Sequence, residues 1–335
     1  MTDRPNPVLV EVTRGPVLEC VHRGSIAVCR PDGTLEWAVG TVDRPMLARS
    51  ACKILQALPM VESGAADRFR LTTEELALAC ASHNGAEIHT SRIGTWLGTL
   101  DLKETDLRCG PQVPNDADAR AALRAGRTTP DQTHNNCSGK HCGMLTLGRH
   151  LGGGVEYVDP EHPVQRAIRA ATADAAREDP AGHAIDGCSA PNFMLSLAGL
   201  ATAVAGFAAP LAVFSGKRQS AAQRLTGAMM THPELVAGEG RACTALMRAA
   251  SGRAAVKTGA EGVFTAILPE AGLGIALKVD DGSARGSEAA MTALLARYGA
   301  LDAEHPVVAR YADAPLLNRR GIDCGRVRAV DQLWP

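Results

Sequence analysis

The strand-like patterns of this chain lie at its two ends, and helical patterns fill the stretch between them. Strand patterns cover residues 8–45 and return over 253–300, whereas apolar residues recur at helical spacing within 50–250. This segregation is typical of α+β proteins and differs from the regular alternation of strands and helices in parallel α/β sheets. If the two strand groups pair, both ends of the chain join one antiparallel sheet beside the helical region. We therefore expect an α+β fold with a single intertwined domain over residues 1–335.

Turn and capping residues define several of the expected elements. Pro31-Asp32-Gly33 predicts the turn of a hairpin between strands 25–30 and 34–39. Thr72 and Glu75 match a capping box at the start of a helix. Other strands are expected over 9–12, 18–21, 254–258, 262–268 and 274–279. Helices are expected from about 50, and over 86–100, 117–125, 139–151, 163–178, 192–208, 218–230, 241–250 and 287–298.

Composition and charge exclude several classes of partner. The 335 residues hold 35 Lys+Arg against 36 Asp+Glu, so no basic surface for nucleic acid or an anionic membrane is expected. Aromatic residues make up 3%, which argues against stacking platforms for bases or sugars. No apolar run reaches the roughly 18–20 residues of a membrane span. The partner predicted is therefore a small molecule, with no nucleic acid and no membrane.

Ten cysteines are spread along the chain without a C-x-x-C pair. The start of the chain, Met1 to Pro7, is polar and proline-rich and lacks the apolar segment of a signal peptide. Disulfide frameworks belong to short secreted chains, so we expect most of these thiols to be reduced and the protein to be cytoplasmic. Several of the cysteines are expected to pack as small apolar core residues.

Three short motifs occur in an order that predicts serine acyl-transfer chemistry. Ser50 and Lys53 form an S-x-x-K at a helix start, where residues three apart share a face, so the Lys53 amine is expected against the Ser50 hydroxyl. A serine hydroxyl needs a nearby base, and a lysine can serve when burial lowers its pKa. An S-x-N follows at 82–84, and a K-T-G lies on an expected strand at 257–259. In this order the motifs resemble the signature of serine β-lactamases and penicillin-binding proteins.

Two loops carry a cysteine next to glycine at a helix start or a turn. The first covers residues 135–143 and includes Lys140 and His141, and the second covers 186–191. Three interpretations compete: a Cys/His nucleophile, a metal site, and buried structural thiols. Because neither a C-x-x-C nor an H-x-x-x-H spacing is present, the residues by themselves favour structural thiols.

Several longer stretches resemble the rhizobial-type (class 3, asparaginase II family) L-asparaginases. The resemblance extends from about residue 22 to about 295, and the tail after about 300 falls outside it. Its most specific segments are 47–53, 80–83, 136–141, 186–188, 236–241 and 274–282. It implies a fold like that of serine β-lactamases, penicillin-binding proteins and glutaminases, and it implies a homodimer.

The resemblance also assigns site residues. It implies two Ser–Lys pairs, Ser50 with Lys53 and Ser82 with Lys257. It further implies a zinc site beside the catalytic centre, with a neutral lysine amine among its ligands, which are Cys137, Lys140 and Cys188.

Four further side chains are candidates for binding the substrate. The Arg49 guanidinium suits bidentate binding of an α-carboxylate, and Asp186, two residues from a predicted zinc ligand, suits an α-ammonium group. Asn84 and His141 are candidate hydrogen-bond donors to the substrate.

The predicted activity is hydrolysis of L-asparagine to L-aspartate and ammonia. Neutral Lys53 would take the proton of Ser50, which attacks the side-chain amide, while backbone N–H groups near Ser50 and the Lys257 strand hold the oxyanion. Ser82 and Lys257 would help to protonate the leaving ammonia. Two alternatives stay open: another Ser–Lys amidohydrolase, such as a glutaminase or a β-lactamase-like enzyme, and a non-catalytic module that binds zinc or an amino acid.

Overall fold

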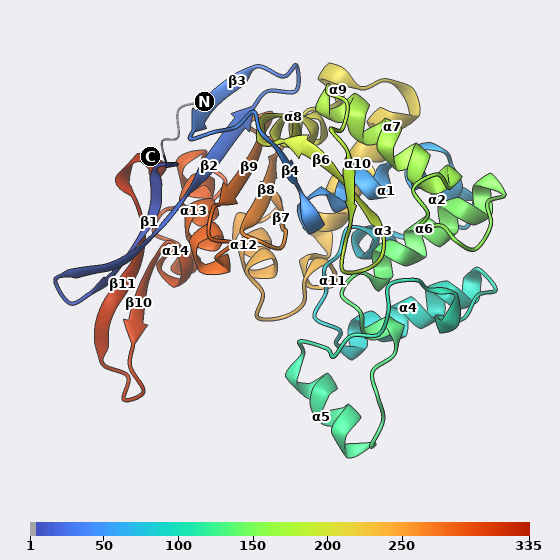
Figure 1. Ribbon diagram of the computed structural model, residues 1–335, viewed down its shortest axis with the longest axis horizontal. Helices are drawn as coiled ribbons and strands as arrows, with labels where there is room; N and C mark the ends of the chain where they lie inside the picture. Colours follow the sequence, from blue (N-terminus) through green and yellow to red (C-terminus); the bar gives the residue numbers. More distant parts are fainter. Residues whose placement is uncertain (1–4) are drawn as a thin grey trace.

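A large antiparallel sheet dominates the computed structural model, which describes residues 5–335 (Figure 1). Residues 1–4, part of the polar start considered above, lie outside the described residues. The strand order is β10-β11-β1-β2-β9-β8-β7, and β3 pairs with β2. The strands are β1 (Val8–Arg14), β2 (Val17–Cys29), β3 (Leu35–Val39), β7 (Ala255–Thr258), β8 (Val263–Leu268), β9 (Leu273–Val279), β10 (Asp313–Leu317) and β11 (Asp323–Ala329).

The two ends of the chain are joined in this sheet, as the sequence predicts. Strand β2 pairs with β9 and β1 pairs with β11, both antiparallel, so the expected α+β fold with an antiparallel sheet is confirmed. The sheet is wider than predicted, because β10 and β11 come from the tail beyond residue 300. The strands expected over 18–21 and 25–30 form one continuous strand, β2. The division into domains stays a prediction.

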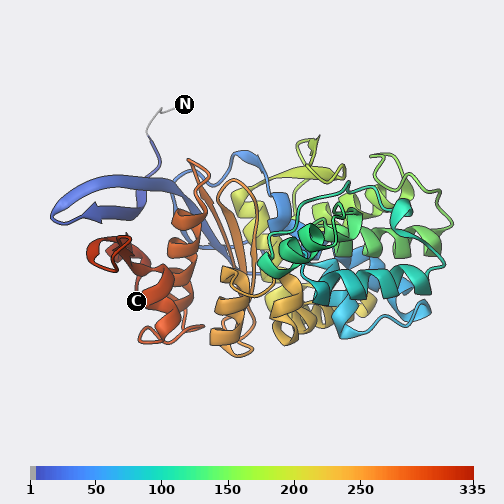
Figure 2. The same ribbon diagram turned by 90° about the horizontal axis from the view of Figure 1, so that it is seen from below.

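Helices cover both faces of the sheet (Figure 2). Helix α8 (Leu197–Ala208) packs on β9, β2 and β8, and α13 (Ala284–Arg297) packs on β8, β9, β1 and β11. Helix α8 approaches closely because β9 has a glycine there: a side chain at Gly274 would collide with the α8 backbone at Ala201 and Ala205. Helix α12 (Ala242–Ala250) contacts β7, and α14 (Pro306–Tyr311) contacts β10.

The middle of the chain forms a helical region around α1 (Lys53–Glu62). Every residue of α1 except Glu62 is buried, and α1 contacts α6, α7 and α10. The predicted capping box of Thr72 and Glu75 is present at the start of α3. The other helices are α2 (Ala65–Arg68), α3 (Thr73–Ala79), α4 (Glu87–Thr99), α5 (Ala117–Ala125), α6 (Ser138–Leu151), α7 (Pro163–Ala176), α9 (Pro210–Val213), α10 (Gly216–Thr231) and α11 (Pro233–Val236). Short 3₁₀ helices are η1 (Arg49–Cys52), η2 (Glu104–Asp106), η3 (Gln132–His134) and η4 (Asp331–Leu333).

A small second sheet lies between the large sheet and the helical region. Its strand order is β4-β6-β5, with β4 (Pro45–Leu47), β5 (His183–Ile185) and β6 (Pro191–Ser196). The helix expected over 192–208 is therefore wrong in its first turn: residues 192–196 belong to β6, and Ser196 caps α8. An apolar run of this length suits a strand or a buried helix, and pairing with β4 decides for the strand.

None of the helices within residues 5–335 is long and apolar enough to cross a membrane.

Candidate active site

The Ser82 hydroxyl lies between two buried lysine amines that come from different parts of the fold. Lys53 is the first residue of α1, Ser82 follows α3, and Lys257 lies on β7. Lys53 Nζ and Lys257 Nζ each lie 2.9 Å from Ser82 Oγ. All three side chains are buried, so the cluster is kept away from water.

The two lysine amines share Ser82 but differ in their other contacts. Lys53 Nζ donates to the Ala81 carbonyl, to Ser82 Oγ and to Cys137 Sγ. Burial lowers the pKa of Lys257 to about 7, so a large share of this amine is neutral at neutral pH. Lys257 Nζ donates to Ser82 Oγ and to the Thr258 carbonyl, so the Ser82 hydroxyl oxygen accepts from both lysine amines.

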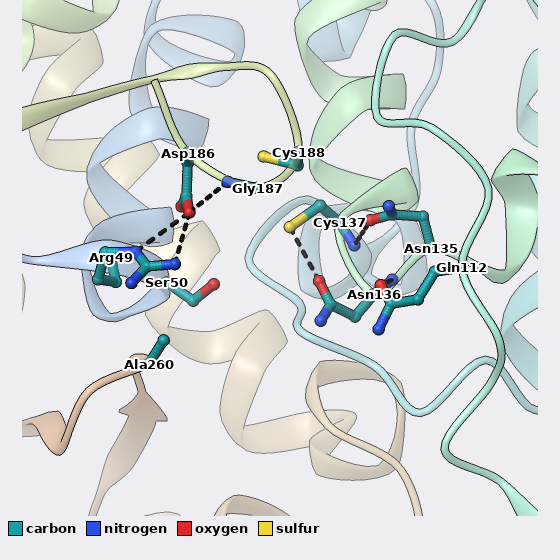
Figure 3. Close-up of a pocket in the computed structure, with 10 residues that line it drawn as sticks. All are labelled: Arg49, Ser50, Gln112, Asn135, Asn136, Cys137, Asp186, Gly187, Cys188 and Ala260. Atoms are coloured by element: carbon teal, nitrogen blue, oxygen red, sulfur yellow. Dashed lines mark hydrogen bonds and ion pairs between the residues drawn. The ribbon is translucent and has the colours of Figure 1, made fainter. Parts of the chain in front are cut away.

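A cavity of about 200 Å³ lies beside this cluster. Pockets that hold drug-sized ligands are commonly about 300–1,000 Å³, so this one suits a molecule the size of an amino acid. Its walls come from η1, from the loop before α6, from the loop after β5 and from the turn after β7 (Figure 3). The lining residues are Arg49, Ser50, Gln112, Asn135, Asn136, Cys137, Asp186, Gly187, Cys188 and Ala260.

Opposite charges face each other at one end of the cavity. Arg49 Nη2 and Nε lie 2.8 and 3.1 Å from Asp186 Oδ1 (Figure 3). Burial opposes the charge on Asp186, but the Arg49 guanidinium and the Gly187 N–H outweigh it and hold the pKa of the carboxyl below its usual range. Glu261, at the rim, lies 3.8 Å from Arg49 Nη1. The pair offers one group for an α-carboxylate and one for an α-ammonium.

Cys137, Lys140 and Cys188 converge at the other end of the cavity. Lys140 Nζ donates to Cys188 Sγ at 2.9 Å, and Lys53 Nζ donates to Cys137 Sγ at 3.1 Å. The Cys137 thiol and then Lys140 lower the pKa of Cys188, which favours the thiolate form of this side chain. Nowhere in residues 5–335 do three His, Cys, Asp or Glu side chains gather as a metal site would require, so a metal here needs the lysine as a ligand. Two thiol sulfurs and one amine form a donor set that fits zinc and leave one coordination position open.

Three predicted site residues lie elsewhere than expected. Within the described chain Ser50 Oγ has no hydrogen bond to Lys53, whose amine turns to Ser82 instead, although Ser50 does line the cavity. Asn84 lines a different cavity, with Asp116, and its amide packs against Gly238. His141 is fully buried and lines no part of the site cavity; its Nδ1 lies 2.8 Å from the Tyr157 hydroxyl, and its Nε2 has no partner within residues 5–335.

Three amide side chains in the cavity wall were not among the predicted site residues. Asn136 Oδ1 accepts from the Cys137 thiol at 3.0 Å, and the Asn136 N–H donates to Gln112 Oε1 at 3.1 Å. Asn135 Oδ1 accepts from the Cys137 N–H. The two asparagines could have been predicted from the sequence, because they directly precede Cys137. Gln112 lies on a loop without any motif, so nothing in the sequence indicated its place in the cavity wall.

Fold and site together define an α+β protein with a serine–lysine centre beside a small charged cavity. The sequence model of the L-asparaginase II family matches residues 10–329, so the chain belongs to that family. The resemblance seen in the sequence is thereby confirmed, and the match also includes most of the tail after residue 300. Among curated proteins, none matches the chain.

Solved structures similar to this fold include glutaminase and β-lactamase chains. Mglu in its native form is 15% identical with a TM-score of 0.44, over 79% of this chain and 61% of Mglu, so this chain spans about three fifths of that protein. A β-lactamase from Mycobacterium bovis is 15% identical with a TM-score of 0.45, over 82% of this chain and 94% of that one. Bacillus subtilis glutaminase YbgJ, in covalent complex with 5-oxo-L-norleucine, is 13% identical with a TM-score of 0.36, over 82% and 86% of the two chains.

Proposed function

We propose that the protein hydrolyses the side-chain amide of L-asparagine to give L-aspartate and ammonia. The observation that carries the proposal is the position of Ser82 between two buried lysine amines, next to a small cavity with an Arg–Asp pair at one end. Membership of the L-asparaginase II family supports the amide substrate.

Recognition of the substrate follows from the charges of the cavity. Arg49 would bind the α-carboxylate, and Asp186, which Arg49 contacts in this structure, would bind the α-ammonium once the substrate carboxylate competes for the guanidinium. The side-chain amide would then point along the cavity toward Ser50. An uncharged amide lacking both α-groups would lose these interactions.

Ser50 is the proposed nucleophile because it lines the cavity, whereas Ser82 does not. The neutral Lys257 amine accepts the Ser82 proton while Ser82 accepts one from Lys53, so the Lys53 amine becomes free to take the Ser50 proton. Ser50 Oγ bonds to the amide carbon and the C=O π pair moves to oxygen. Within residues 5–335 the N–H groups of Ser50 and Ala260 have no acceptor, so both are available for that oxyanion.

The second half of the reaction returns the protons. The oxyanion collapses, the C–N bond breaks, and the nitrogen takes a proton from the Lys53–Ser82–Lys257 chain to leave as ammonia. Water then attacks the acyl-enzyme, its proton passes to the same chain, and Ser50 leaves with a proton as L-aspartate forms.

Mass spectrometry of enzyme quenched during turnover tests the nucleophile. We expect an aspartyl adduct on the peptide that contains Ser50, absent in Ser50→Ala. An adduct on Ser82 would overturn the assignment of the nucleophile, and no ammonia release from L-asparagine would overturn the function. L-Glutamine, D-asparagine and a β-lactam in the same assay distinguish the other amidohydrolases of this chemistry.

We also propose zinc as the resident metal, held by Cys137, Lys140 and Cys188. Bound zinc would supply a fixed positive charge at this end of the cavity and would tie the loop before α6 to the loop after β5. Metal analysis of the purified protein should find close to one zinc per chain. Zinc far below that level, together with an unchanged melting temperature after chelation, would refute the site.

We also propose that the protein is a homodimer and that it is cytoplasmic. Light scattering at several protein concentrations tests the first, and cell fractionation tests the second.

A further inference from the structure

Asn192 contacts the backbone of Arg49 at two points. This side chain lies on β6 and is 2% exposed. Its Oδ1 accepts from the Arg49 N–H at 3.1 Å, and its Nδ2 donates to the Arg49 carbonyl at 3.2 Å. Both polar atoms of one buried amide are therefore used on the main chain of a single residue of the cavity wall.

The register of the small sheet explains these contacts. Strands β4 and β6 pair Met46 with Leu195 and Leu47 with Met194, so continued pairing would place Arg49 opposite Asn192. The chain leaves β4 after Leu47 and turns into η1 instead. The Asn192 amide thus supplies the two hydrogen bonds that the next pair of backbone groups would have made.

The backbone of Arg49 requires such support. Its φ angle is +51°, in the left-handed region that a residue with a Cβ adopts only at a cost. Conformations of this kind persist where surrounding contacts over-determine them. Besides Asn192, the Cys52 thiol donates to the Arg49 carbonyl at 3.1 Å.

This conformation sets two groups of the cavity at once. It directs the Arg49 guanidinium to Asp186 and places Ser50, the next residue, in the cavity wall. Strand β6 also pairs with β5, whose end leads into the loop of Asp186. Asn192 therefore joins the two walls that carry the charged pair.

We propose that Asn192 is a positioning residue, which holds Arg49 in the left-handed conformation that aligns the substrate carboxylate with Ser50. The proposal rests on the function proposed above, because it concerns the same cavity. It assigns Asn192 no contact with the reacting atoms: its effect passes through the backbone of Arg49.

The first test compares two truncations on the same strand. Asn192→Ala should lower kcat/KM for L-asparagine at least about tenfold, with both a higher KM and a lower kcat, because Arg49 and Ser50 both shift. Ser196→Ala, at the other end of β6, loses its bond to Glu178 and the α8 cap, so it should lower the melting temperature and leave kcat and KM unchanged. Equal kinetics in Asn192→Ala and wild type would overturn the proposal.

The second test uses glycine to remove the need for support. Asn192→Ala is introduced into Arg49→Ala and into Arg49→Gly, which both lack the guanidinium. Glycine adopts positive φ without strain, so the further loss of kcat and of melting temperature should be several-fold smaller in the glycine background. Equal losses in the two backgrounds would refute the backbone argument. A wild-type protein that releases no ammonia from L-asparagine would instead overturn the proposed function, and this proposal with it.

Discussion

Replacing Lys257 by methionine tests whether a buried neutral amine drives the proton transfers. Methionine keeps an unbranched side chain in the buried space on β7 but has no nitrogen to accept a proton from Ser82. The other contacts of Ser82, with Lys53 above all, are not removed by this change. The variant therefore isolates the base from the rest of the cluster.

The expected magnitude follows from the pKa. With a pKa of about 7, roughly half of the Lys257 amine is neutral at pH 7, whereas at the ordinary value of 10.5 about one in 3,000 would be neutral. Burial thus multiplies the amount of usable base about 10³-fold. General-base catalysis typically contributes about 10²–10⁴-fold, so kcat of Lys257→Met should fall by about 10³.

The pKa of Lys257 also predicts the direction in which the activity changes with pH. Because the neutral amine is the active form, kcat/KM of the wild type should rise as the pH increases through about 7 and level off above it. Ammonia release measured from pH 5.5 to 9 should show this rise in the wild type and lose it in Lys257→Met. As a matched control, Lys278→Met removes another lysine whose pKa burial lowers, on β9, and should keep both the rate and the pH profile. A Lys257→Met enzyme within a few-fold of wild type, or one with the same rise near pH 7, would refute the reasoning.

Three further predictions concern recognition, metal and acid stability. Arg49→Lys keeps the charge but loses the planar fork, so KM for L-asparagine should rise about tenfold to hundredfold while the melting temperature changes little; an unchanged KM would contradict a role in binding the carboxylate. Cys188→Ser should lower the zinc content well below that of the wild type, and equal zinc in both would exclude this ligand. Burial lowers the pKa of His83 and His89, so below about pH 6.5 the unfolded chain binds protons that the folded chain does not, and each histidine should lower the unfolding free energy by up to about 1 kcal/mol between pH 6.5 and 5.5. Urea titrations at pH 6.5 and 5.5 measure this fall in the unfolding free energy, which His83→Gln should reduce by about 1 kcal/mol.

The sequence predicted a turn and a helix cap correctly where the pattern depends on residues close together in the chain. The capping box at Thr72 and the hairpin around Asp32 depend on residues within a few positions of each other, and both are present. The strand over 192–196 was missed because an apolar run suits either structure until a partner strand is known. Strands β10 and β11 were missed for a related reason: they pair with each other, and β11 joins the sheet by pairing with β1 from the opposite end of the chain.

The candidate site shows the same division between local and distant information. Spacing predicted a Ser50–Lys53 contact, but a lysine side chain is long and flexible and Lys53 reaches Ser82 instead. Asn192 had no signal at all, because its importance depends on the register of β6 against β4. The family resemblance predicted that Cys137, Lys140 and Cys188 lie together, which the spacing of the residues did not predict.

The amino-acid sequence by itself determined the types and order of the reactive groups: an S-x-x-K, an S-x-N and a K-T-G between two sets of strands that pair in one sheet. Only the tertiary structure decided how these groups act on one another. Ser82 lies 29 residues from Lys53 and 175 from Lys257, and folding brings both amines to 2.9 Å from its hydroxyl. Burial then gives Lys257 a pKa near neutrality, because removing water penalises the charged amine, and that penalty exists only once the core has closed around it.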